Sequence, residues 1–545
     1  MFVRIKKVGP YEYLQIVENR RENKRSLQRV IATLGRMDEL RAKGEVETLA
    51  RSLSRFSERV LLVLSGKSDS IHAEAKKVGP ALIFERLWKG LGIDRILHRL
   101  LADRRFGFDV ERAIFMTVLH RLFTSGSDRS ADTWRRDYVI KDVDGLSLHH
   151  LYRAMAFLGE ELEDQNGRTP FSPRCTKDSI EEDLFSLHQD LFSGLDLVFF
   201  DTTSLYFEGE GGAIGELGHS KDHRSDLNQM IVGVVLDHGG NPICSEMWPG
   251  STTDVKSLVP VIERIRSRFT IGSFCIVADR GMISEGTVTY LAKKKIPYIL
   301  GARMRKVKEI KEAVLSRAGR YREVHPEGVS SKDPSPLKVK EVMVDDRRYI
   351  VCLNERQARK DAADRQAIIE SLQEKLKSNP KSLVGNKGYR KYLSMDRDTI
   401  LLNEQKIEEE NRFDGKWVLK TNTDLSAEQV ALKYKELWQV EQVFRDMKSV
   451  LDTRPIFHQR TETIRGHVFC SFLALVLIKE LYRRLEKAGN DFEWADIKQD
   501  LEALEEITIE DNGKKLAIRS ACNGVCGKVF QAAGVAIPLT IREVA

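Results

Sequence analysis

The spacing of hydrophobic residues changes several times along the chain, and each change predicts a different kind of element. Near the N-terminus apolar and polar residues alternate through Phe2–Ile5 and Tyr11–Val17, as they do in antiparallel strands. From about 79 to 158 apolar residues instead recur every three or four positions, as on one face of a helix. These patterns predict a small β-meander followed by a helix near Met37–Phe56, and then helices at Ala81–Gly90, Ile93–Leu101, Val110–Phe123 and Leu148–Leu158.

The stretch between Leu195 and Gly301 combines short apolar strands with amphipathic helices. We predict strands at Leu195–Glu208, Gln229–Leu236, Pro242–Met247, Ser273–Asp279 and Pro297–Gly301, and helices at Asp254–Phe269 and Glu285–Lys295. Three antiparallel strands that give way to alternating helices and strands are what a ribonuclease-H-like α/β fold with a mixed sheet requires. A mixed α/β sheet of another topology is the alternative.

The pattern changes again after Ala302, because residues 303–412 are polar, charged and interrupted by turns. Within them we predict a long charged helix at Glu355–Lys377 and strands at Lys338–Val344 and Tyr349–Leu353. Trp417–Thr421 is predicted to be the closing strand. The position of this polar region indicates an insertion that splits the α/β core.

A capping box at Ser426–Gln429 predicts the start of a further helix, which reads YKELWQVEQVFRDMK from 434 to 448. At 100° per residue one stripe of this helix holds Tyr434, Trp438, Glu441, Arg445 and Lys448. Taken alone, the stripe is an ordinary solvated face. A carboxylate with cations one and two turns away also suits a metal ligand beside a phosphate.

Two aspartates in the predicted sheet strengthen the second interpretation. Asp201 follows Val198–Phe200 inside a strand, where a carboxylate is costly to bury unless it is paired or binds a metal. Asp279 ends another buried strand, where capping of a turn is the simpler interpretation. If the first and fourth strands are neighbours, both carboxylates meet at one edge of the sheet, and Glu441 can join them. Such oxygen ligands select two Mg²⁺ or Mn²⁺ ions rather than zinc.

Composition and charge fit a soluble globular protein. The 545 residues are 41% hydrophobic and 31% charged, with a net charge of +7, which permits a polyanionic partner without requiring one. Residues 1–60 hold 14 Lys and Arg against 8 Asp and Glu. Seven scattered cysteines favour a reducing compartment, and we interpret the closest two, Cys522 and Cys526, as structural thiols. The N-terminus lacks a signal-peptide apolar core, and the longest apolar run, Val468–Ile478, is too short to span a bilayer.

A polar loop lies between the first two predicted strands of the sheet. Its sequence, GHSKDHRSD at 218–226, places Lys221 and Arg224 beside the predicted carboxylate edge, which suits contact with phosphates. A zinc site made from His219, Asp222 and His223 is the weaker alternative, because no thiolate lies nearby in the sequence.

These residues resemble bacterial insertion-sequence transposases of the DDE class. The resemblance covers about residues 1–485 and points to the subgroup whose third carboxylate lies in a Tyr-x₂-Arg-x₃-Glu-x₆-Lys signature and whose catalytic domain is split by an insertion. Tyr434, Glu441 and Lys448 fit that spacing, and Leu437 stands where the signature has Arg. The remaining matching segments are Asp201-Thr202-Thr203, Asp279-Arg280-Gly281, the GHSKDHRSD loop and Trp248–Asp254.

The resemblance implies cut-and-paste transposition with Asp201, Asp279 and Glu441 as the metal-binding catalytic residues. It also implies binding of terminal inverted repeats and target DNA, and a homodimer in a synaptic complex. We expect DNA contacts from Tyr434, Lys448, Arg445, Lys221, Arg224 and Arg280, with Arg445 replacing the signature's Arg. Trp417 is a candidate for stacking an extruded base in a hairpin intermediate, and core packing is the alternative. The expected location is the bacterial cytoplasm.

The predicted domains follow from these segments. They are a small β-rich N-terminal domain at 1–60, a helical DNA-end-binding domain at 79–190, the two parts of the ribonuclease-H-like core at 191–302 and 423–485, the insertion domain at 303–422, and a C-terminal segment without an assigned role at 486–545. Because all three carboxylates are present, we favour an enzyme over a catalytically silent DNA-end-binding relative. The insertion and the extra N-terminal domains disfavour an ordinary nuclease.

Overall fold

The structure, a computed structural model, divides into two compact units. It describes residues 2–22, 25–46, 48–49, 72–169, 172–188, 197–269, 274–324, 337–378, 390–396, 399–511 and 514–544. The first unit comprises 1–86, 133–141 and 484–545, and the second comprises 87–132 and 142–483. None of the described helices combines the length and the apolar composition that are needed to cross a membrane.

The N-terminal part of the first unit is the predicted β-meander. Strands β1 (Phe2–Val8), β2 (Tyr11–Glu22) and β3 (Arg25–Arg36) pair antiparallel in sequence order. Helix α1 (Met37–Ala42) follows and buries Met37 and Leu40. The predicted end of this helix near Phe56 lies outside the described residues.

The first unit also contains a sheet that joins distant parts of the chain. Its strand order is β18 (Ile541–Val544), β17 (Lys514–Arg519), β16 (Glu505–Asp511) and β4 (His72–Lys77). Helices α17 (Trp494–Glu502) and α18 (Cys526–Ala533) accompany it. The C-terminal segment is therefore paired with a strand more than 400 residues earlier, which its own sequence pattern did not predict.

The predicted helices between 79 and 158 are confirmed. The helices of this region and its continuation are α4 (Gly79–Gly90), α5 (Ile93–Leu101), α6 (Val110–Phe123), α7 (Asp128–Trp134), α8 (Leu148–Gly159) and α9 (Thr176–Leu187). All residues of α6 are buried, which explains why its sequence is apolar on more than one face. The apolar run at 468–478 lies within α16 (Thr461–Lys487) and is also buried, as predicted.

A nine-stranded mixed sheet forms the core of the second unit. Its strands are β10 (Arg322–Val324), β11 (Leu337–Val344), β12 (Arg347–Leu353), β15 (Lys416–Thr421), β9 (Tyr298–Gly301), β8 (Cys275–Ala278), β5 (Leu197–Tyr206), β6 (Gln229–Leu236) and β7 (Pro242–Pro249), in spatial order. The β5–β8 and β8–β9 pairs are parallel and the others antiparallel. This large mixed sheet fits a ribonuclease-H-like core, and strands of the predicted insertion continue it without a break.

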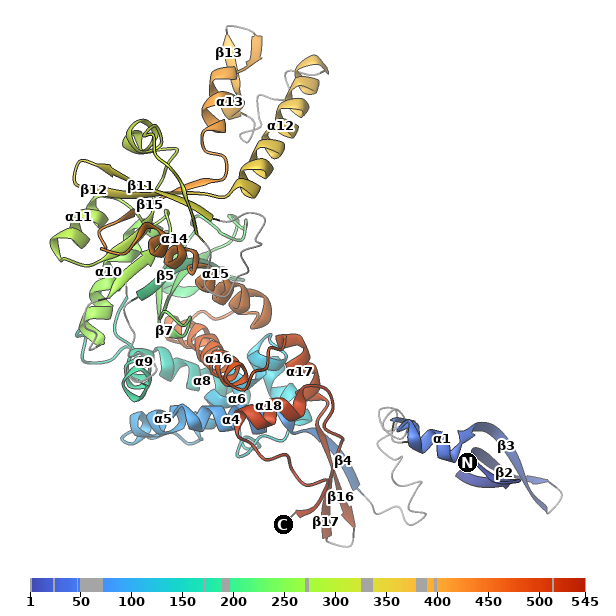
Figure 1. The fold of residues 1–545 in the computed structure, drawn as a ribbon. Helices are drawn as coiled ribbons and strands as arrows, with labels where there is room; N and C mark the ends of the chain where they lie inside the picture. The colour runs from blue at the N-terminus through green and yellow to red at the C-terminus, as the bar shows by residue number, and fades with distance from the viewer. Residues whose placement is uncertain are drawn as a thin grey trace. The chain divides into compact units, whose positions relative to one another are not determined.

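Helices cover both faces of this sheet (Figure 1). One face packs against α10 (Asp254–Arg268) and α11 (Glu285–Lys293) in a core that includes Phe200, Ala278 and Leu300. Helices α14 (Ala427–Lys435) and α15 (Trp438–Arg445) contact strands of the same sheet, α14 at β8 and β9 and α15 at β5 and β6. Successive side chains of a strand point to opposite faces of the sheet. A residue that directly follows one of these core residues along a strand therefore has its side chain on the face opposite to α10 and α11.

The region between β12 and β15 forms an arm beyond the sheet. In Figure 1 its elements project together from the end of β12. They are α12 (Glu355–Ser378), β13 (Leu393–Asp396), β14 (Thr399–Leu402) and α13 (Glu404–Asn411). Leu372 and Tyr392 are buried in a small cluster within the arm.

The prediction of one continuous helix at 434–448 is wrong, because the structure has two helices separated by a turn. The capping box at Ser426 is present, but α14 ends at Lys435 and a tight turn precedes α15. In this turn Leu437 N–H bonds to Tyr434 O, and Val440 N–H bonds to Leu437 O, each at 3.1 Å. A wider turn, η6 (Asp446–Val450), follows α15. Because Leu437 is buried at the interruption, the turn places an apolar side chain in the core.

A buried charge network joins α9 to the sheet and α10. Asp178 Oδ1 lies 2.8–3.0 Å from nitrogen atoms of Lys177, Arg264 and Arg268. Glu181 and Glu246 complete the network through further bonds to Arg268 and Arg264. Three cations and three carboxylates balance, so each buried charge has an opposite partner.

Candidate active site

Asp201 on β5 and Asp279 directly after β8 lie side by side, where the pairing of these two neighbouring parallel strands ends. Phe200 on β5 pairs with Ala278 on β8, and the two aspartates are the next residues. Neighbouring strands are about 4.8 Å apart. Because Phe200 and Ala278 face the core formed with α10 and α11, alternation turns both aspartates toward the other face. The first and fourth predicted strands are thus neighbours, which is the condition under which the two carboxylates were expected to meet.

Tyr434 on α14 binds the second aspartate directly. Its hydroxyl donates a hydrogen bond of 3.0 Å to Asp279 Oδ1. Burial and the charge of Asp279 raise the pKa of Tyr434, so the phenol keeps its proton and remains a donor. A Cβ at Gly301 would overlap this hydroxyl, so Gly301 provides the space that the phenol occupies.

A third carboxylate, Asp254, lies close to Asp201 and to the next residue, Thr202. Its Oδ1 accepts a hydrogen bond of 2.6 Å from the hydroxyl of Thr202, and its Oδ2 lies 3.4 Å from Nζ of Lys221. Lys221 also donates to the carbonyl oxygen of Thr202 at 2.6 Å. A Cβ at Gly281 would lie 3.3 Å from Asp254 Oδ2. Asp254 therefore links β5 to the loop that follows Asp279.

The pKa of Asp201 is raised to about 6, mainly because the carboxyl is buried. The charges of Asp279 and Asp254 act in the same direction. Lys221 and the backbone N–H of Thr202, which donates to Asp201 Oδ1 at 2.7 Å, oppose the shift. Neighbouring carboxylates that resist ionisation favour a divalent cation, which relieves their repulsion.

Glu441 lies on α15, the helix that contacts β5 and β6. Its side chain is exposed, and no described residue forms a hydrogen bond or ion pair with it. The oxygen atoms of Asp201, Asp279 and Glu441 do not converge within 4.8 Å of one another, since among the described residues only Asp128, His458 and His467 meet that criterion. The structure thus brings the two aspartates together and leaves Glu441 on a neighbouring element.

Lys448 reaches the polar loop between β5 and β6. Its Nζ lies 2.9 Å from Asp222 Oδ1, and Arg454 Nε lies 3.4 Å from Oδ2 of the same carboxylate. Arg224 pairs with Asp226 and lies over the ring of Tyr206. With Asp222 held by two cations, and without convergence of His219 and His223 on it among the described residues, the zinc alternative has no support.

Two models of known protein families match the chain. Residues 193–477 match the family described as "Transposase DDE domain". Residues 3–69 match "IS1634 family transposase, N-terminal domain". The chain belongs to the DDE transposases. No curated protein matches it.

Three further predicted residues occupy distinct positions in the transposase. Arg280 is exposed directly after Asp279, and Arg445 is exposed on α15, one turn beyond Glu441. Trp417 is half-buried on β15. Since Leu419 pairs with Gly301, Trp417 lies beyond Gly301, at the carboxylate end of the sheet and on the face that Tyr434 covers.

Asp254 was not among the predicted site residues, although it ends the segment Trp248–Asp254 that resembles the family. The available signal was an acidic residue in the first turn of a helix that follows the antiparallel strands. Only the fold shows that this turn faces Thr202, 52 residues earlier.

The cluster of Asp128, His458 and His467 has a structural role in the transposase. His467 Nε2 lies 3.1 Å from the carbonyl oxygen of Thr453, and its Nδ1 lies 2.9 Å from Arg121. Nε2 therefore donates and Nδ1 accepts, which leaves no ring nitrogen free for a metal. Thr453 also donates a hydrogen bond to the carbonyl oxygen of Met447 in η6, so the cluster is connected to the turn that follows α15.

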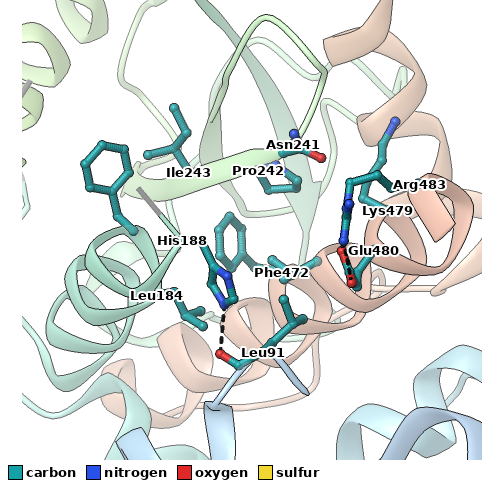
Figure 2. Close-up of a pocket in the computed structure, with 12 residues that line it drawn as sticks. Leu91, Leu184, His188, Asn241, Pro242, Ile243, Phe472, Lys479, Glu480 and Arg483 are labelled. Carbon is teal, nitrogen blue, oxygen red and sulfur yellow. Dashed lines mark hydrogen bonds and ion pairs between the residues drawn. The ribbon is translucent and has the colours of Figure 1, made fainter. Parts of the chain in front are cut away.

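The pocket in Figure 2 is separate from Asp201, Asp279 and Glu441. It has a volume of about 50 Å³ and lies between α9, β7 and α16. Mostly apolar side chains line it, and His188 bonds across it to the carbonyl oxygen of Leu91 at 3.0 Å. It contains none of the predicted site residues.

Proposed function

We propose that this transposase cuts the ends of its element and transfers them to target DNA, using two Mg²⁺ or Mn²⁺ ions bound by Asp201, Asp279 and Glu441. The observation that carries the proposal is that Asp201 and Asp279 are the residues directly after Phe200 and Ala278, which pair on parallel strands. Hard carboxylate oxygens suit these ions. The ions would activate a water or 3′-hydroxyl and stabilise the leaving oxygen.

The chain's own groups prepare this site. Tyr434 fixes the orientation of Asp279 through its hydrogen bond. Lys221 favours the ionised form of Asp201, which is the form that binds a metal. Glu441 remains exposed on α15, so its carboxylate is accessible from solvent.

Exposed cations near Glu441 would position the DNA. Leu437 is buried and has no charge, so it cannot replace the signature's Arg. Arg445 is exposed on the helix of Glu441 and takes this role in our proposal. Arg280 would contact a further phosphate, while Arg224, Lys221 and Lys448 would do so by exchanging their carboxylate partners for DNA. Trp417 would stack an extruded base in a hairpin intermediate.

The substrate would be the terminal inverted repeats, held with target DNA by a homodimer. In this arrangement the helical region at 79–190 contributes to end binding. The discriminating experiment incubates the purified protein with duplex DNA from the element's end and Mg²⁺. We expect cleavage by the wild type, and binding without cleavage by Asp201→Asn and Glu441→Gln. Unchanged cleavage by either variant would refute the assignment, and Asp183→Asn, on α9, is the control.

Direct metal binding by Glu441 has a sharper test. A Glu441→Cys variant replaces a hard oxygen with a soft sulfur, so we expect activity with Mn²⁺ and almost none with Mg²⁺. Equal activity with both ions would show that Glu441 is not a ligand.

A catalytically silent DNA-end-binding protein is the second candidate. The separation of Glu441 from the two aspartates favours it, because the three carboxylates do not converge. Specific end binding by the wild type without cleavage in either Mg²⁺ or Mn²⁺ would establish this alternative.

A further inference from the structure

A cationic groove lies between α8 and the segment that leads into α16. Its volume is about 290 Å³. The groove is lined mainly by side chains that donate hydrogen bonds: Tyr152, Arg153, His458, Gln459, Arg460 and Thr463. Together they present positive charge and neutral donors, the groups that proteins use to contact DNA phosphates.

The positive charges of the two arginines in the groove are accessible to a ligand. Arg153 and Arg460 are exposed, and no described carboxylate pairs with either side chain. The guanidinium of Arg153 lies 5.5 Å from the ring centre of Phe106 and 5.2 Å from that of Phe108. These contacts orient the cation without neutralising it.

The surroundings of Tyr152 contain both a cation, Arg129, and a carboxylate, Asp128. Arg129 lies close enough to Tyr152 to influence its pKa, opposing the effect of Asp128. The carboxylate of Asp128 is buried and bonded to His458 at 3.1 Å, so it is not exposed to a ligand in the groove.

Backbone hydrogen bonds connect the groove to β5, the strand that carries Asp201. Ile456 N–H bonds to the carbonyl oxygen of Tyr206, and Glu208 N–H bonds to that of Ile456, both at 3.0 Å. Phe207 forms a parallel bridge with Ile456. Since this bridge is six residues beyond Asp201, the groove begins about 20 Å from that carboxylate.

We propose that the groove binds the phosphodiester backbone of the element-end duplex, about six base pairs from the phosphate that is cut. The distance follows from a rise of about 3.4 Å per base pair. The inference rests on the proposed function, because the distance is counted from Asp201. We favour the element end as the occupant of the groove. The reason is that β5, which carries Asp201, is bonded to the groove and so keeps it at a constant distance from the site where the DNA would be cut.

The test compares three proteins on a 40-base-pair duplex of the element's end. They are the wild type, Arg153→Ala/Arg460→Ala and the control Arg168→Ala, which removes an exposed arginine near the C-terminal end of α10. We expect the double variant to bind at least about tenfold more weakly at low salt, with a slope of log affinity against log salt that is smaller by roughly one to two. The control should bind like the wild type, and thermal unfolding should show that all three are folded.

A scan with single methylphosphonate substitutions locates the contact. Neutralising a phosphate about six base pairs from the cut should weaken binding by the wild type and leave the double variant unaffected. Unchanged end binding by the double variant would refute the groove, even if the wild type cuts DNA normally. Normal end binding with a loss confined to strand transfer would place target DNA there and also refute it. Absence of cutting by the wild type, with the expected binding differences, would refute the proposed catalysis and leave the groove supported.

Discussion

The hydroxyl of Tyr434 donates a hydrogen bond of 3.0 Å to Asp279, which is 155 residues earlier in the chain. Tyr434 was predicted as a DNA contact, and that role remains a prediction. The hydrogen bond gives it a second role as a positioning residue, because it connects α14 directly to one carboxylate of the candidate site.

We therefore predict that Tyr434→Phe raises the Mg²⁺ concentration needed for half-maximal cleavage by about tenfold or more. Loss of such an orienting bond to a metal ligand typically weakens metal affinity by this amount. The control is Tyr290→Phe, which removes a hydrogen bond from Tyr290 to Glu263 at the surface. If both variants required the wild-type Mg²⁺ concentration, a positioning role for Tyr434 would be excluded.

Lys221 and Asp254 should shift the pH dependence of metal binding in opposite directions. The charge of Lys221 lowers the pKa of Asp201, and that of Asp254 raises it. Protons and Mg²⁺ compete for the carboxylate, so Lys221→Met should move the midpoint of Mg²⁺ affinity to higher pH and Asp254→Asn to lower pH. Mg²⁺ titrations across pH 5–8 measure the midpoints, with Lys293→Met as the control. Shifts in the same direction would contradict this electrostatic account.

We predict that the ionised carboxylate of Asp201 destabilises the folded state of the metal-free protein. Its folded-state pKa of about 6 exceeds the ordinary value of 3.8, so ionisation is harder in the folded state. The cost is fully present above pH 6 and disappears as the pH falls toward 4. Asp201→Asn should therefore increase the free energy of unfolding at pH 8 by up to about 3 kcal/mol, and by less at pH 5. Denaturant unfolding in EDTA tests this, and a gain that does not depend on pH would contradict it.

The buried charge network should be sensitive to the loss of one partner. Asp178→Ala leaves Lys177, Arg264 and Arg268 partly uncompensated, and we expect a loss of about 3–5 kcal/mol in unfolding free energy. Asp183 on the same helix pairs with the exposed Arg99, so Asp183→Ala should cost less than about 1 kcal/mol. Equal losses in denaturant unfolding would show that burial does not set the strength of these pairs.

Much of the core was predictable from local pattern. The strand around Asp201 and the strand before Asp279 have short apolar runs typical of buried strands, and the structure shows that they pair in parallel. The capping box at Ser426 was predictable because its signature lies within four residues.

The remaining features depend on contacts between distant residues. The turn at Leu437 interrupts a sequence with good helical periodicity, and burial of one side chain outweighs that local preference. Asp254 is ordinary in its own segment and becomes part of the site only through Thr202 and Lys221. The pairing of β16 with β4 has no local signal at all.

The arm between β12 and β15 leaves and re-enters the sheet at paired residues. Leu353 is opposite Lys416, Asn354 N–H bonds to Gly415 O at 2.8 Å, and Gly415 has a φ of +60°. Removing 355–414 would join Asn354 to Gly415, and Asn-Gly is a preferred two-residue hairpin turn. The shortened chain would lose Phe413 from the core of the sheet but keep every strand of the nine-stranded sheet. The whole arm is thus topologically equivalent to the loop of a single hairpin.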